Sequence, residues 1–241
     1  MAEEKQIIIT LDNILSSFFD GVISKKDILY APSPLLTAMN SMYVQNPSSE
    51  IIAFNLDDDA IATTINQLKN HLRSCNAVCM DAFNTPLTYL LDELICNIQQ
   101  HAQTEQGYAF LDFNVATNAI EIVIADMGIT IYGSYVAAQK HLDKLGNSDA
   151  EALNLAQNGY SVKNLPDAEN RGYGISSNIR MVVDGLRGEF AVLSGNALLV
   201  ETTKQRKILA LPKEIDYKGT MVVIRIPAIL PEGFNLYKYT S

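Results

Sequence analysis

The clearest pattern of apolar and polar positions lies between residues 86 and 102. Apolar side chains recur there every three to four positions, as expected for the buried face of an α-helix. The residues of this face are Leu87, Leu90, Leu91, Leu94, Ile95 and Ile98. Thr85 can cap such a helix with Pro86 at its first position, so the pattern predicts a helix from Pro86 to about Ala102.

Beyond this helix, strands and helices follow one another along the chain. Apolar runs predict strands over residues 108–115, 119–125, 189–193, 198–202 and 220–227, with 207–210 as an extension. Helical spacing predicts helices over residues 131–143, 149–157 and about 173–183. This succession predicts an α+β fold: a two-layer sandwich of one mixed, mostly antiparallel sheet with helices on one face.

The first part of the chain carries weaker signals. Short apolar runs predict strands at residues 7–10 and 51–54, and a helix over about residues 60–72 follows the acidic residues 57–59. We interpret these aspartates as a solvated helix cap, with a metal cluster as the alternative. The expected division is an N-terminal α/β extension of unknown role, a core domain and a C-terminal tail, at residues 1–80, 83–228 and 229–241.

Composition and charge exclude several classes of protein. The chain is 48% hydrophobic and 19% charged, which suits a domain with a buried core. No apolar run approaches the roughly 20 residues of a membrane-spanning helix. Because the acidic N-terminus also lacks the features of a secretory signal, we expect a cytoplasmic protein without a membrane partner. The net charge of −9 argues against a nucleic-acid surface, but it leaves a nucleotide pocket open.

The number and spacing of the cysteines give no sign of a disulfide-linked or zinc-binding fold. Cys75, Cys79 and Cys96 are odd in number and have no matching second pair. The spacing predicts neither a disulfide framework nor a zinc site, and we expect three buried free thiols.

Candidate chemistry begins on the helix at residues 86–102. Glu93, Asn97 and His101 are spaced four positions apart, so they lie on one face of the helix. A carboxylate and an amide oxygen on successive turns can hold a divalent cation and a water molecule, and magnesium prefers such oxygen ligands. The alternative is a polar helix face in contact with solvent.

Further short motifs follow along the chain. Asp126 ends an apolar strand and needs a donor, such as the exocyclic amine of adenine, while Gly128 lets the chain pass close to a flat ring. Gly172 and Gly174 lie where a loop enters a helix, and their N–H groups can face phosphate oxygens. Thr220 opens the last strand, where it can close one side of a base pocket. Each motif alone has an ordinary alternative: a turn, a flexible loop or a strand start.

The order of these motifs resembles that of the Bergerat-fold ATPases. This superfamily contains histidine kinases, type II topoisomerase ATPase subunits, Hsp90 chaperones, mismatch-repair MutL and anti-sigma-factor serine kinases. The resemblance covers residues 83–228 and implies an α+β sandwich that binds ATP with Mg²⁺. It also implies a lid over the nucleotide at residues 158–171, with Lys163 and Arg171 as phosphate partners.

The resemblance assigns roles to the first two motifs. Glu93 matches the acid that orients the attacking water in the hydrolysing branches, which makes it the expected catalytic residue. Asn97 matches the asparagine that coordinates magnesium. Asp126 matches the aspartate that reads adenine, and Gly128 matches the first glycine of that box.

The later motifs match less completely. Gly172 and Gly174 correspond to the second glycine box beneath the phosphates, and Thr220 to the threonine that supports the contact between aspartate and adenine through water. The family's first box continues with a second glycine where this chain has Thr130. A Cβ there could narrow the pocket or stiffen the loop. For His101 we expect a buried, hydrogen-bonded side chain rather than a catalytic one.

The branch of the superfamily is a separate question, because one fold serves many functions. His71 is the only histidine upstream of the motifs, and no acidic residue follows it directly, so it is a poor match for a phosphoacceptor. We expect no transducer domain after residue 227. We therefore expect a stand-alone regulatory ATPase or a protein kinase of the serine/threonine or histidine type. Glu93 would act as general base on water or on a partner's hydroxyl.

Two alternatives stay open. In one, the protein binds nucleotide without turnover, and its lid presents a nucleotide-dependent surface to a protein partner. In the other, residues 1–80 form an interaction module and the glycine boxes are degenerate. The phosphoacceptor and the oligomeric state are not assigned by the sequence.

Overall fold

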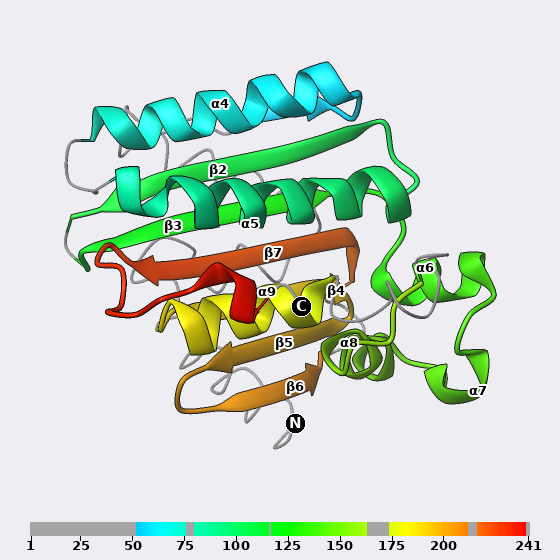
Figure 1. Cartoon of the computed structure of the whole chain (residues 1–241). Coiled ribbons are helices and arrows are strands. Elements are labelled where there is room, and N and C mark those ends of the chain that lie inside the picture. The colour runs from blue at the N-terminus through cyan, green and yellow to red at the C-terminus, as the bar shows by residue number, and fades with distance from the viewer. Residues whose placement is uncertain (1–51, 76–79, 116, 163–173, 212–215, 240–241) are drawn as a thin grey trace.

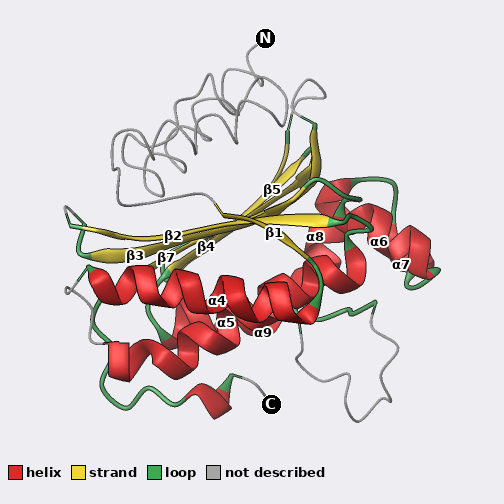
Figure 2. Ribbon diagram, turned by 90° about the horizontal axis from the view of Figure 1, so that it is seen from above, coloured by secondary structure: helices red, strands yellow, loops and turns green. Residues whose placement is uncertain are grey.

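The computed structural model describes residues 52–75, 80–115, 117–162, 174–211 and 216–239. They form an α+β sandwich in which one seven-stranded sheet carries helices on one face (Figure 1). Seen from above, helices α4, α5 and α9 lie side by side on the same side of the strands (Figure 2). The predicted fold class is therefore confirmed.

The sheet places the last strand of the chain near its centre. The strands are β1 Ile52–Asn55, β2 Gln106–Asn114, β3 Ala119–Asp126, β4 Glu189–Gly195, β5 Ala197–Thr202, β6 Arg206–Ala210 and β7 Tyr217–Pro227. Their order is β1-β2-β3-β7-β4-β5-β6, and every pairing between these described strands is antiparallel rather than mixed. Ala125 of β3 lies opposite Met221 of β7, so the end of β3 adjoins the start of β7.

The helices fall into two groups. The first covers the sheet and comprises α4 Asp58–Ser74, α5 Met80–His101 and α9 Ile175–Arg180, which continues as the π-helical turn η1 Met181–Gly185. The second group lies at one end of the sheet (Figure 1) and comprises α6 Ile131–Ala138, α7 Leu142–Leu145 and α8 Asp149–Gln157.

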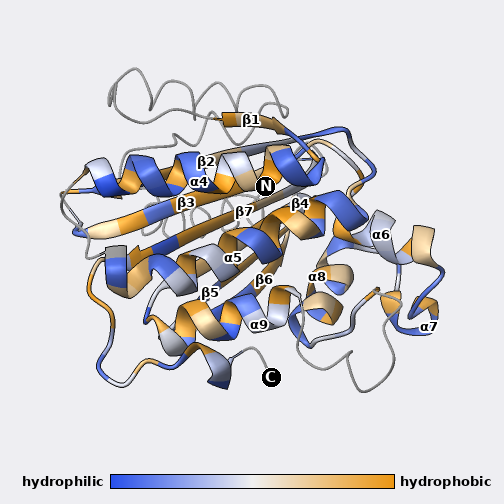
Figure 3. Ribbon diagram, turned by 45° about the horizontal axis from the view of Figure 1, so that its top comes forward, coloured by the Kyte–Doolittle hydropathy of each residue, from blue (hydrophilic) through white to orange (hydrophobic). Residues whose placement is uncertain are grey.

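The core lies between the first helix group and the sheet. On α5, Leu90, Leu91 and Ile95 are completely buried, and Ile120 and Ile122 of β3 are equally inaccessible. Figure 3 shows strands that are mainly hydrophobic beneath helices that carry both hydrophilic and hydrophobic residues. The apolar spacing predicted for residues 86–102 is the face that α5 buries, and hydrophobic burial of this kind is the main driving force for folding.

Helix α5 begins at Met80, so the predicted start at Thr85 and Pro86 is wrong. Pro86 lies inside the helix, where it removes one backbone hydrogen bond. Upstream, Phe83 is only 1% exposed and belongs to the core, so its burial favours continuation of the helix past the proline. Tertiary packing therefore overrides the local stop signal.

The helix predicted at residues 131–143 is broken into two pieces. Gln139 and His141 have φ angles of 54° and 55°, in the left-handed region that helices do not contain. The chain turns there between α6 and α7. The helix predicted at about residues 173–183 begins instead at Ile175.

Part of the predicted N-terminal extension is built into the same sheet. β1 pairs with β2, and α4 packs against α5 and β2. The Asp57 side chain accepts a hydrogen bond from the Ala60 N–H at 2.9 Å and caps α4, as the acidic run predicts. The strand predicted at residues 7–10 lies outside the described residues.

The segment after β7 packs back on the helix layer. The rings of Phe234 and Tyr239 stack 5.9 Å apart, and both lie against Gly185 at the end of η1. The Arg180 guanidinium donates a hydrogen bond to the Lys238 carbonyl at 3.2 Å. The predicted tail is thus ordered against α9 and η1 up to residue 239.

Candidate functional site

A pocket lies where the end of α5 meets the end of β3 and the start of β7. Its wall contains Asn97 of α5, Asp126 of β3, Thr220 of β7 and Gly174, which precedes α9. The pocket encloses about 850 Å³ of empty space, part of it open to solvent. Four residues singled out in the sequence therefore share one cavity.

The remaining wall is mostly apolar with a polar margin. Leu94, Ile98, Ile124, Ile129, Ile131, Ile175 and Val222 supply the apolar part. His101, Ser134, Tyr135, Tyr160, Ser161 and Ser176 supply polar groups. A flat apolar ligand with a few polar atoms suits such a wall.

Asp126 supplies the deeply buried carboxyl of the pocket, with 3% of its surface exposed. Burial raises the pKa of its carboxyl to about 6, while hydrogen bonds from the backbone N–H groups of Gly128 and Thr220 act in the opposite direction. The Gly128 N–H donates to Asp126 Oδ1 at 2.9 Å. The backbone thus holds the carboxyl in one orientation, where it can accept a further hydrogen bond from a ligand.

Two glycines allow the close packing around Asp126. A Cβ on Gly219, whose φ is 102°, would lie 2.2 Å from the Asp126 carbonyl oxygen. A Cβ on Gly128 would lie 1.8 Å from the carbonyl oxygen of Ala102, which also accepts a hydrogen bond from the Ile129 N–H at 2.7 Å. Gly128 does not line the pocket. The absence of a side chain at Gly128 lets the loop after β3 pack against the end of α5.

Asn97 and Glu93 lie one turn apart on α5, but only Asn97 lines the pocket. Asn97 lines the pocket, and its buried Nδ2 has no hydrogen-bond partner among the described residues. An amide nitrogen without a hydrogen-bond partner in a cavity wall can donate a hydrogen bond to a polar ligand. Glu93 is half-buried and is not part of the wall. The predicted catalytic carboxylate is therefore not brought together with the other pocket residues.

Ser194 contacts two residues of the pocket wall, Ile131 and Thr220, and was not found from the sequence. Its hydroxyl accepts a hydrogen bond from the Ile131 N–H at 2.9 Å and lies 3.1 Å from the Thr220 hydroxyl. It also donates to the Gly219 carbonyl at 3.2 Å. One buried side chain thus joins β4, β7 and α6. A serine before a turn glycine is common, so no local signal distinguishes it.

Thr130 stands where the resembling family has a second glycine, and it caps α6. Its φ is −71°, so the position does not require glycine, and its hydroxyl accepts a hydrogen bond from the Gly133 N–H at 3.1 Å. Thr130 is not part of the pocket wall. The threonine therefore starts a helix without narrowing the cavity.

The outer wall is held by two aromatic side chains of the α6–α7 region. The Tyr135 hydroxyl donates to the Tyr160 carbonyl, and His141 Nε2 lies 3.1 Å from the Ser161 carbonyl oxygen. The His141 and Tyr160 rings also meet edge to face at 5.2 Å. These contacts fix the chain that lines the cavity up to residue 162. The predicted phosphate partners and the first glycine of the second box lie outside the described residues: Lys163, Arg171 and Gly172.

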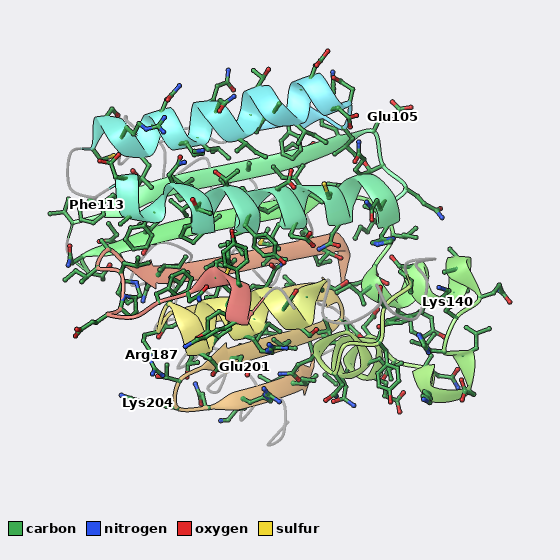
Figure 4. All side chains as sticks on the ribbon, in the orientation of Figure 1. Glu105, Phe113, Lys140, Arg187, Glu201 and Lys204 are labelled. Carbon is green, nitrogen blue, oxygen red and sulfur yellow. The ribbon has the colours of Figure 1, made fainter. Side chains whose placement is uncertain are left out.

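Helix α8 is anchored on the sheet by buried polar contacts. Gln157 donates a hydrogen bond to Glu201 of β5, which also forms an ion pair with Arg206 (Glu201 is labelled in Figure 4). At the other end of α8, Asp149 Oδ2 accepts a hydrogen bond from the Asn196 N–H at 3.2 Å. Helix α8 is thus tied to β5 and to the β4–β5 turn.

Comparisons with protein-family models, curated proteins and solved structures each found no match. The resemblance to the Bergerat-fold ATPases therefore stays a prediction that rests on the motifs and on the geometry of the pocket. Among the helices of the described segments, none combines the length and the apolarity needed to span a lipid bilayer.

Proposed function

We propose that this protein binds ATP with magnesium in the pocket between α5, β3 and β7, as a regulatory ATPase or protein kinase. The observation that carries the proposal is the shared cavity of Asn97, Asp126, Gly174 and Thr220. These residues are far apart in the chain, and each was selected for one part of a nucleotide. Their meeting in one cavity is the arrangement that the motif order predicts.

The adenine end of the proposed ligand would lie against Asp126. A buried carboxyl, held by backbone N–H groups, can accept the hydrogen bond of an exocyclic amine. The apolar wall from Ile98 and Ile124 suits the faces of a flat ring. Guanine presents a carbonyl oxygen where adenine has its amine, and this oxygen would face the Asp126 oxygens. The site should therefore prefer ATP to GTP.

The phosphate end would lie toward Asn97 and Gly174. Asn97 offers a side-chain amide in the wall, and a Cβ on Gly174 would meet nothing within 4 Å, so the backbone is open there. Bound magnesium would neutralise charge on the phosphates, with Asn97 as its protein ligand. The chain's own residues hold the base and orient the triphosphate.

ATP with magnesium should raise the melting temperature of the wild-type protein, because a ligand selective for the native state stabilises it. At a ligand concentration of 100 Kd the gain is about 2.7 kcal/mol, or roughly 5–10 °C for a chain of this size. Replacing Asn97 with alanine should remove most of the magnesium-dependent part of this shift. Thermal unfolding with ATP, with and without magnesium, measures both effects.

The matched control for Asn97→Ala is Gln100→Ala, an exposed position on the same helix outside the pocket wall. It should leave the ATP shift unchanged. Absence of any ATP shift in the wild-type protein would refute the proposed function. An equal magnesium dependence in Asn97→Ala would refute only the role given to Asn97.

A second candidate function is nucleotide binding without turnover, in which the pocket controls a surface for a protein partner. The position of Glu93 favours it, because that carboxylate is not part of the pocket wall. In this case Glu93→Gln and the wild-type protein should be stabilised equally by ATP, and neither should release phosphate. Phosphate release by the wild-type protein that is lost in Glu93→Gln would instead establish the general base.

A further inference from the structure

Three side chains with metal-binding atoms meet at a distance from the nucleotide pocket. His71 and Cys75 lie at the C-terminal end of α4, and Asp112 lies on β2. His71 Nε2 is 3.1 Å from Asp112 Oδ1, and Cys75 Sγ is 4.0 Å from the same oxygen. The ligand atoms of all three residues lie within 4.8 Å of one another.

This cluster and the pocket occupy opposite ends of the sheet. In Figure 4, the labelled Phe113, next to Asp112 in β2, marks one end, and the labelled Lys140, after α6, marks the other. A ligand at the cluster would therefore not touch the residues assigned to nucleotide. The two sites can be tested separately.

Helix periodicity and strand position bring the three ligands together. His71 and Cys75 are four positions apart and share one face of α4. Asp112 lies 37 positions after Cys75 and is only 6% exposed. The usual sign of a zinc site in a sequence is a pair of closely spaced cysteines. Here the ligands are instead a histidine and a cysteine on one helix and an aspartate on a strand.

A divalent cation between the three side chains would place a positive charge beside the buried Asp112 carboxylate and would favour the Cys75 thiolate.

We propose that His71, Cys75 and Asp112 bind a zinc ion. Imidazole nitrogen, thiolate sulfur and carboxylate oxygen are the ligands that zinc takes in proteins, and a water molecule would complete a tetrahedral set. Metal–ligand bonds of about 2.0–2.3 Å imply donor separations of roughly 3.3–3.6 Å. The Cys75 sulfur and the Asp112 oxygen, 4.0 Å apart, need to approach by a few tenths of an ångström, and any pair at the full 4.8 Å spread of the cluster by somewhat more than 1 Å. Binding transfers the Cys75 thiol proton to solvent as the zinc–sulfur bond forms.

The proposed zinc would fasten the C-terminal end of α4 to β2. Residue 75 is the C-cap of α4, where helix ends tend to fray. A metal that joins this end to the sheet should raise the melting temperature of the full chain. Zinc binding at this cluster requires no nucleotide, so its test does not depend on whether the protein binds ATP.

The test uses the full chain after removal of metals with a chelator, in the absence of nucleotide. Calorimetric titration with Zn²⁺ in two buffers of different protonation enthalpy should give one zinc per chain and release of at least one proton. Titration with Co²⁺ should produce the near-ultraviolet charge-transfer band of a cobalt–thiolate bond. Cys75→Ser should abolish this band, and Asp112→Asn should weaken zinc binding by more than about tenfold.

The matched control is Cys96→Ser, at a half-buried cysteine on α5 outside the cluster, which should keep the band and the affinity. Circular dichroism establishes that each variant is folded, and the wild-type cobalt spectrum tests the proposal without any variant. Absence of zinc binding or of the thiolate band in the wild-type protein would overturn it. Loss of the band in Cys79→Ser but not in Cys75→Ser would overturn it equally.

Discussion

Replacing Asp126 with asparagine should abolish most of the stabilisation by ATP and should leave the ligand-free protein at least as stable as the wild type at pH 7. The carboxyl is 3% exposed, so it is costly to keep charged in the fold. A hydrogen bond to a charged group contributes about 1.5–3 kcal/mol, and its loss corresponds to roughly 10- to 100-fold weaker binding. Thermal unfolding with ATP and with GTP measures the loss of affinity and of preference.

The pH dependence of stability should change in the same variant. Burial raises the pKa of Asp126 from 3.8 to about 6, so between these values the native state binds a proton that the unfolded state has lost. The free energy of unfolding of the wild type should therefore fall as the pH rises through this window, by about 1–3 kcal/mol. Asp126→Asn should lack this component.

Asp92→Asn, an exposed position on α5, is the matched control and should keep both the ATP shift and the pH profile. Denaturant unfolding at pH 4, 5, 6 and 7 (a series of roughly unit steps across the shifted pKa) resolves the difference. Full stabilisation of Asp126→Asn by ATP would remove the carboxyl from the proposed recognition of adenine. A pH profile equal to that of the wild type would show that Asp126 titrates normally in the fold.

Replacing Gly128 with alanine should destabilise the protein by about 3 kcal/mol and should also prevent ATP binding. The new Cβ would lie 1.8 Å from the Ala102 carbonyl oxygen, so the loop after β3 must move away from the end of α5. This movement would break the hydrogen bonds from the Gly128 N–H to Asp126 and from the Ile129 N–H to Ala102. Urea unfolding and the ATP-dependent melting shift measure the two effects.

Gly233→Ala separates steric contact from backbone strain. Gly233 has a φ of 72°, and a Cβ there would meet nothing within 4 Å. Its replacement should cost only the conformational strain of about 1–2 kcal/mol, with no effect on ATP binding. If Gly128→Ala proves no more damaging than Gly233→Ala, the loop and the end of α5 can separate easily, contrary to the packing described.

Periodicity predicted most elements because they bury one face. The strands at residues 119–125 and 220–227 and the apolar face of α5 were found this way, and they are the core of the fold. The start of α5 was missed because Pro86 is a local stop signal, while Phe83 is held by distant packing. Local chemistry cannot show which of the two prevails.

The pocket could be predicted only in part. Asn97, Asp126 and Thr220 stand in motifs whose order indicates a shared site, and they do line one cavity. Ser194 was missed because its importance comes from the arrangement of strands, which brings β4 beside β7. Glu93 was selected by its spacing from Asn97, but helical spacing does not decide which of the two side chains reaches a cavity.

The central place of β7 has a consequence for the order in which the molecule can be assembled. Before β7 is available, β3 and β4 present unpaired edges, and such edges invite pairing with other chains. β7 is synthesised after β1–β3 and after β4–β6, so these two halves of the sheet cannot be joined until β7 has emerged from the ribosome. Non-local pairing of this kind slows folding, so newly made chains should depend on protection from aggregation until residue 227 has left the ribosome.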